Sequence, residues 1–64
     1  MRHTEFWARM EQALGGEYAS SWARLTVIGA LGSRTVSEAL AEGVDPKQVW
    51  TAVHQVLELP ESDR

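Results

Sequence analysis

Few residues of this 64-residue chain are of the types that perform catalysis or bind metals. His3 and His54 are the only imidazoles, and neither has a second His or a Cys at the spacing that zinc sites use. Ser20 and Ser21 lack the glycine elbow and the neighbouring base of a serine nucleophile. The chain has no Cys, which excludes disulfides and thiolate chemistry. We therefore expect no catalytic residue, no metal site and no cofactor.

Two other patterns have structural explanations. Gly15-Gly16 lacks the Lys and the preceding strand of a phosphate-binding loop, so we interpret it as a helix terminator. The three Trp residues are not interleaved with cations, as a base-stacking surface would require, and we interpret them as core residues. Because a domain of this size has little room for an enclosed ligand pocket, we expect a protein that is not an enzyme.

Residues 36–58 resemble a helix-turn-helix. A small residue, a Gly turn and two apolar positions follow the spacing of that motif, namely Ala39, Gly43, Val44 and Val49. The second helix would then present Lys47, Thr51 and His54 to DNA. Lys47 is the only secure cation on that side, whereas phosphate contacts usually recruit several Lys or Arg residues. We keep a DNA-binding accessory protein as the alternative function, with nucleic acid disfavoured as a partner.

The charge distribution supports this order of preference. The net charge is −3, and the acidic residues are concentrated in the second half of the chain. Such a charge balance argues against a broad surface for nucleic acids or anionic membranes in that half of the chain.

The sequence also predicts no membrane-spanning segment. No stretch approaches the roughly 20 apolar residues of a membrane span, and the N-terminus lacks the apolar core of a signal peptide. We expect a cytoplasmic protein without membrane contact.

Helix start and stop signals divide the chain into four segments. The signals are N-caps, capping boxes and terminating Gly or Pro residues, namely Thr4, Gly15-Gly16, Gly32, Thr35 with Glu38, Gly43, Asp45 with Pro46 and Gln48, and Pro60. They predict an all-α fold, a compact bundle of four helices at about 5–14, 17–31, 36–42 and 46–58. Residues 1–59 would form one domain, and residues 60–64 a frayed tail.

Helical periodicity predicts the core and one exposed apolar surface. The expected core positions are Phe6, Trp7, Met10, Leu14, Trp22, Leu25, Ile28, Leu40, Val49, Val53 and Val56, with Trp50 at their edge. The second helix is apolar nearly all round in its C-terminal half. Val27, Ile28, Leu31 and Arg34 are therefore candidates for contact with an unknown protein partner or with a second copy in a homodimer. The alternative is that Val27 is simply buried.

The chain also resembles a known family. The resemblance rests on four blocks: Arg2-His3-Thr4-Glu5-Phe6-Trp7; Gly16-Glu17-Tyr18-Ala19; Leu31-Gly32-Ser33-Arg34-Thr35 with Glu38-Ala39-Leu40; and Gly43-Val44-Asp45-Pro46-Lys47 with Val49-Trp50. Together they resemble the actinobacterial domain-of-unknown-function family 3046 over nearly the whole chain. The resemblance implies a compact helical fold, an actinobacterial source and no catalytic residue. Gly29 stands where relatives often have a helix-ending Pro, so we expect the second helix to continue past it. A non-catalytic protein-interaction or regulatory module is the function we predict.

Overall fold

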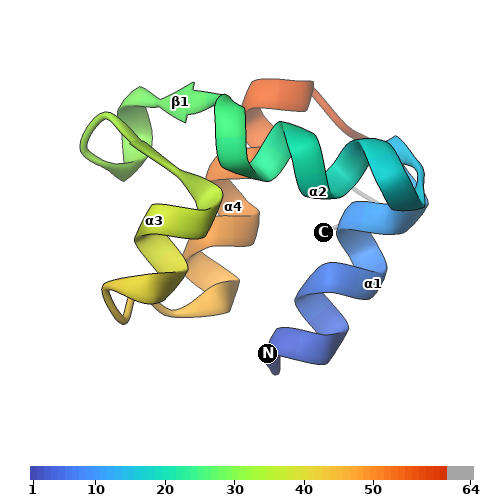
Figure 1. The fold of residues 1–64 in the computed structure, drawn as a ribbon, viewed down its shortest axis with the longest axis horizontal. Helices are drawn as coiled ribbons and strands as arrows, with labels where there is room; N and C mark the ends of the chain where they lie inside the picture. The colour runs from blue at the N-terminus through green and yellow to red at the C-terminus, as the bar shows by residue number, and fades with distance from the viewer. Residues whose placement is uncertain (61–64) are drawn as a thin grey trace.

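Four α-helices make up most of the computed structural model, which describes residues 1–60 (Figure 1). They are α1 (His3–Leu14), α2 (Gly16–Leu25), α3 (Val36–Ala41) and α4 (Pro46–Leu57). The segment between α2 and α3 contains two short strands, β1 (Val27–Ile28) and β2 (Arg34–Thr35), and one 3-10 turn, η1 (Gly29–Leu31). The fold is therefore mostly helical, and the prediction of a purely all-α bundle is corrected by a small antiparallel sheet.

The second helix is shorter than predicted because the chain becomes extended at Thr26. This residue has φ −90° and ψ 116°, and it begins a run of three β-branched residues, which favour extended backbone. Val27 then pairs with Thr35, and Ile28 pairs with Arg34. The prediction of a helix over 17–31, continuing past Gly29, is thus wrong beyond Leu25, since strand pairing competes with the apolar periodicity that suggested a helix.

The first helix begins earlier than predicted. The amide of Phe6 donates to the carbonyl of Arg2 at 2.9 Å, so Arg2 is the N-cap and Thr4 lies inside the first turn. Arg2 has no side-chain capping bond. Glu5 remains in the first turn, where the helix dipole favours a carboxylate. The predicted Thr4 cap is wrong, because the backbone already forms helical hydrogen bonds ahead of it.

The predicted capping box at the start of α3 is confirmed. The Glu38 amide donates to Thr35 Oγ1 at 3.1 Å, and the Thr35 amide donates to Glu38 Oε1 at 2.9 Å. Both bonds satisfy amides that have no partner within the helix. The capping box therefore fixes the point at which β2 becomes α3.

The turn between α3 and α4 also follows its sequence signals. Gly43 has φ +92°, and its amide donates to the Leu40 carbonyl at 3.1 Å. The Val44 amide donates to the Ala39 carbonyl at 3.0 Å, which completes a Schellman motif. Asp45 then caps α4, with its carboxylate accepting from the Lys47 amide at 2.9 Å.

The second capping box, predicted at this turn, does not form. It would have joined Asp45 to Gln48, but the Asp45 side chain reaches only the nearer Lys47 amide. Pro46 occupies the first position of α4, as predicted. The helix ends at Leu57, so the predicted stop near Glu58 is confirmed. The tail predicted for 60–64 lies, apart from Pro60, outside the described residues.

The core receives large side chains from α1, α4 and the segment between α2 and α3, and only alanines from α2. Its members are Phe6, Met10, Ala19, Ala23, Ile28, Leu31, Val36, Ala39, Val49, Trp50, Ala52 and Val53. The Phe6 ring meets Trp7 edge to face, with centroids 5.3 Å apart, and Trp50 with centroids 6.2 Å apart. Aromatic rings favour this edge-to-face arrangement. Phe6 thus joins α1 to α4 at the centre of the molecule.

Several predicted core positions are corrected. Phe6, Met10, Ile28, Val49 and Val53 are buried as predicted. Four further residues predicted in the core are only partly buried and pack against its edge, namely Trp7, Leu14, Trp22 and Leu40. Leu25 and Val56 are exposed, and Trp50 is buried rather than peripheral. For Trp22 and Leu25 the cause is that α2 turns its two small residues, Ala19 and Ala23, toward the core and its larger side chains outward.

Candidate functional site

The predicted partner surface is divided between the core and the solvent. Ile28 and Leu31 are buried, so these two candidates belong to the core and not to a surface. Val27 is 61% exposed, which excludes the alternative that it is buried. Arg34 is also exposed, and its Nη2 lies 3.4 Å from Glu42 Oε1. The predicted set of four therefore does not form one contact surface, because two short strands and a 3-10 turn replace the predicted α-helix here.

Large apolar side chains are nevertheless exposed along one side of α2 and into β1. Tyr18 is 60% exposed and Leu25 is 76% exposed, with the partly buried Trp22 between them. Their spacing of four and three residues places them on one helical face. Val27 follows within two residues of Leu25. We call these four residues, Tyr18, Trp22, Leu25 and Val27, the α2 surface.

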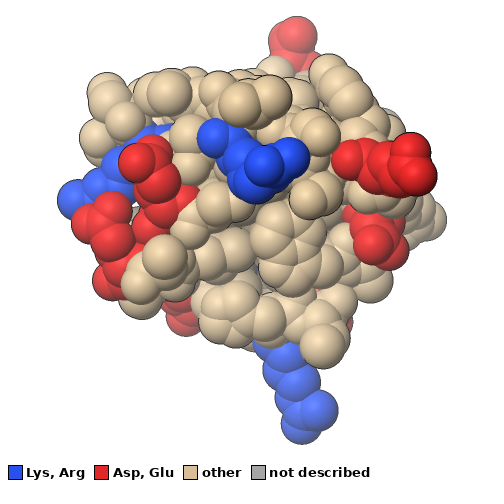
Figure 2. All heavy atoms as spheres, in the orientation of Figure 1, with Lys and Arg blue, Asp and Glu red and all other residues tan. Residues whose placement is uncertain are grey.

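The face of the molecule that α2 crosses in Figure 1 is poor in charge at its middle. Figure 2 shows this uncharged area below α2, with basic atoms over α2 itself and acidic side chains at the left and right margins of the view. Helical periodicity predicts that Trp22 and Leu25 of this face belong to the core. The spacing of Ala19 and Ala23 is the signal that could have corrected this, because small residues allow a helix to approach its neighbours closely.

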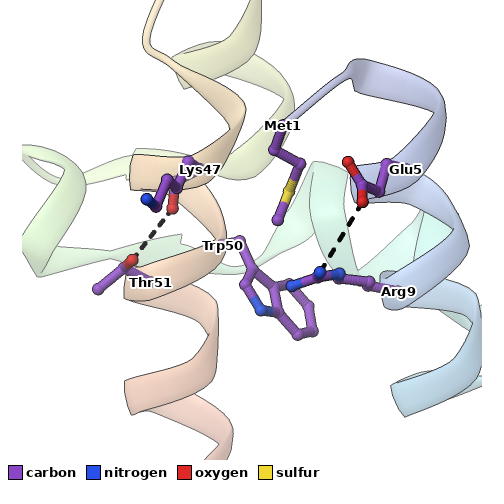
Figure 3. Close-up of a pocket in the computed structure, with 6 residues that line it drawn as sticks. All are labelled: Met1, Glu5, Arg9, Lys47, Trp50 and Thr51. Atoms are coloured by element: carbon purple, nitrogen blue, oxygen red, sulfur yellow. Dashed lines mark hydrogen bonds and ion pairs between the residues drawn. The ribbon is translucent and has the colours of Figure 1, made fainter. Parts of the chain in front are cut away.

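A second feature is a hollow between α1 and α4. It has a volume of about 440 Å³ and is lined by Met1, Glu5, Arg9, Lys47, Trp50 and Thr51 (Figure 3). We call it the α1–α4 hollow. The Met1 side chain points toward the Trp50 ring from the side of α1. The exposed Glu5, Lys47 and Thr51 at its margin leave it open to solvent, in contrast to an enclosed pocket.

The charged side chains around the α1–α4 hollow are two cations and one carboxylate. Arg9 Nη2 lies 3.9 Å from Glu5 Oε2, one helical turn away. Thr51 Oγ1 donates to the Lys47 carbonyl at 3.0 Å, which leaves the Lys47 ammonium uninvolved in this bond. Within residues 1–60, no carboxylate lies at ion-pair distance from Lys47. The hollow is therefore locally cationic on a protein whose net charge is −3.

The predicted DNA-contact residues have different environments. Lys47 and Thr51 are exposed at the start of α4, but His54 is 8% exposed and counts among the buried residues. Its Nε2 donates to the Pro60 carbonyl at 2.8 Å, so Nε2 carries the proton. The prediction that α4 presents His54 to DNA is therefore wrong, because the segment after α4 folds back over this side chain.

Other classes of site lack support in the part of the chain that is described. Over residues 1–60, no group of three or more His, Cys, Asp or Glu side chains is arranged to hold a metal ion. None of the helices found over the same range is long and apolar enough to cross a membrane. The α2 surface and the α1–α4 hollow are thus the two features that suggest function.

Comparison with known proteins gives a family and no activity. The family described as Protein of unknown function (DUF3046) matches residues 1–62. No curated protein and no solved structure matches the chain. The match therefore covers both features described above without assigning a role to either.

Proposed function

The chain belongs to the DUF3046 family of proteins of unknown function, and we propose that it is a non-catalytic module that binds another protein through the α2 surface. The observation that carries this proposal is the exposure of Tyr18, Leu25 and Val27. Large apolar side chains exposed together on one helical face are typical of sites of protein contact.

Leu25 and Val27 lose the free energy of burial in the isolated chain, because their side chains are largely exposed. Full burial of a Val or Leu side chain contributes about 1.5–3 kcal/mol. A domain of this size has a free energy of unfolding of only about 3–10 kcal/mol. The free energy that full burial of Leu25 and Val27 would contribute is therefore comparable to a large part of the total free energy of unfolding. Burial against a partner recovers it.

The residue types of the α2 surface favour an apolar protein partner. Tyr18 and Trp22 carry aromatic rings, and such residues are enriched among the positions that dominate binding energy. None of its four residues is charged, so the partner face that complements it is apolar as well. A nucleic acid would require several cations, and α2 supplies only Arg24. A protein presenting an apolar helix is the partner that fits.

Our first test replaces Tyr18 and Leu25 together with Ser. We expect the affinity for the partner recovered from the source organism to fall at least about tenfold, which corresponds to about 1.4 kcal/mol. The measurement is a quantitative pull-down, with sedimentation of the purified chain to show whether a second copy is the partner. Thermal unfolding followed by circular dichroism establishes that the variant is folded.

The matched control is Val56→Ser, which changes an exposed apolar residue of α4 outside the α2 surface. This variant should retain binding. If the two variants retain or lose binding equally, the α2 surface is not the contact, and the proposal is contradicted.

DNA binding is the alternative function, and one observation favours testing it. The fold brings Arg9 of α1 to the same hollow as Lys47 and Thr51 of α4. The carboxylate of Glu5 lies there too, and several cations are usual in duplex binding. We expect no detectable binding to duplex DNA at about 0.15 M salt and no steep recovery at lower salt. Submicromolar binding that Lys47→Glu weakens would instead favour the helix-turn-helix alternative.

A further inference from the structure

We infer that the α1–α4 hollow binds a small organic carboxylate, in which a single anionic group is attached to an aromatic or aliphatic part. The inference is independent of the proposed function, because none of the residues that line this hollow belongs to the α2 surface. Its volume of about 440 Å³ falls within the range of about 300–1,000 Å³ that is typical of small-molecule sites.

The lining divides into an apolar part and a charged part. The buried Trp50 ring and the Met1 side chain provide apolar contact, and Figure 3 shows both between the two helices. The charged groups of Arg9 and Lys47 come from opposite sides of the hollow, one on each helix. A ligand with an apolar body and one polar end matches this division.

The charged side chains of the lining suit a carboxylate. The side chains of Arg9, Lys47 and Glu5 sum to one positive charge, which a single carboxylate neutralises. Arg9 also offers a planar guanidinium, whose donors fit the two oxygens of a carboxylate. The Glu5 pair at 3.9 Å is long and partly exposed, so it holds Arg9 only weakly.

The test uses 3-phenylpropanoate as the probe and its neutral amide as the matched control. Each is titrated into the full chain labelled with ¹⁵N, and the shifts of the Trp50 indole and the Arg9 side chain are followed. We expect the carboxylate to bind with a dissociation constant of about 1 mM or less, corresponding to at least about 4.1 kcal/mol. The amide should bind at least about fivefold more weakly.

Two variants assign the charge dependence. The double substitution Arg9→Gln with Lys47→Gln should remove the preference for the carboxylate. Replacement of Arg24, an exposed cation of α2, by Gln should leave that preference unchanged.

A second experiment asks whether the carboxylate belongs to a protein C-terminus or to a free metabolite. It compares a peptide that ends in Phe with a free carboxylate and the same peptide in its amidated form. Tighter binding of the free peptide than of 3-phenylpropanoate would identify a protein C-terminus as the ligand, and the reverse order a free metabolite. Equal binding of carboxylate and amide, or tighter binding of phenyl phosphate, would overturn the inference.

Discussion

Replacement of Phe6 by Ala is expected to lower the free energy of unfolding by about 3–5 kcal/mol. The Phe6 side chain is completely buried and contacts the rings of Trp7 and Trp50 edge to face. Its removal would leave a cavity between α1 and α4 and abolish both aromatic contacts. The total stability of a domain of this size is only about 3–10 kcal/mol, so the variant should be largely unfolded at the lower end of that range. Urea unfolding followed by circular dichroism measures the difference.

The matched control for this prediction is Leu25→Ala. Leu25 is an equally apolar residue, but the structure places it on the outside of α2, so its truncation should change the free energy of unfolding by about 0.5 kcal/mol or less. Similar losses for the two variants would show that α2 faces the core with its Leu25 side. That result would contradict both the core and the α2 surface described above.

The second large effect is expected at the turn between α3 and α4. Gly43→Val should lower the free energy of unfolding by about 2–3 kcal/mol, because a β-branched residue is strongly disfavoured at φ +92°. A Cβ built at this position meets no atom within 4 Å, so the loss reflects backbone conformation and not a clash. Thermal and urea unfolding of the variant provide the measurement.

Gly29→Ala is the control for Gly43→Val. A Cβ at Gly29 likewise meets no atom within 4 Å, but this residue does not have a positive φ. Its substitution should be neutral or stabilising by about 0.4–1 kcal/mol, through the lower entropy of the unfolded chain. A tolerated Gly43→Val would mean that the turn joining α3 to α4 has another geometry.

The parts of the fold that were predicted correctly depend on signals within a few residues of one another. The capping box of Thr35 and Glu38, the positive φ of Gly43 and the Asp45 cap are local hydrogen-bonding patterns. Their chemistry does not depend on distant parts of the chain, so the sequence alone indicates where α3 and α4 begin. The family resemblance added agreement on the helical fold, which the structure confirms in its coarser form.

The incorrect predictions involve competition between segments. Val27 and Ile28 fit a helical stripe, but pairing with β2 makes them extended. This pairing depends on a turn at Gly32 and Ser33, where both residues have positive φ. The predicted orientation of α2 is also wrong. Periodicity identifies the apolar face that contains Trp22 and Leu25, but it does not show that the face with Ala19 and Ala23 packs more closely against the other helices.

The candidate sites were predicted less well than the helices for the same reason. The α1–α4 hollow brings together Arg9 and Lys47, which are far apart in the sequence and share no motif. The burial of His54 depends on the Pro60 carbonyl returning over α4. Sequence spacing cannot reveal either arrangement, since each requires the packing of two segments.

The central claim, that the α2 surface contacts a protein, is most directly tested by crosslinking from position 25. The chain contains no Cys, so a single Leu25→Cys substitution attaches a photoreactive group at that site alone. Gln12→Cys, on an exposed position of α1, is the control. We expect a discrete adduct with one protein from position 25, and none from position 12, after irradiation in the source organism's extract. The claim would be contradicted by the same adducts from both positions, or by no adduct from position 25.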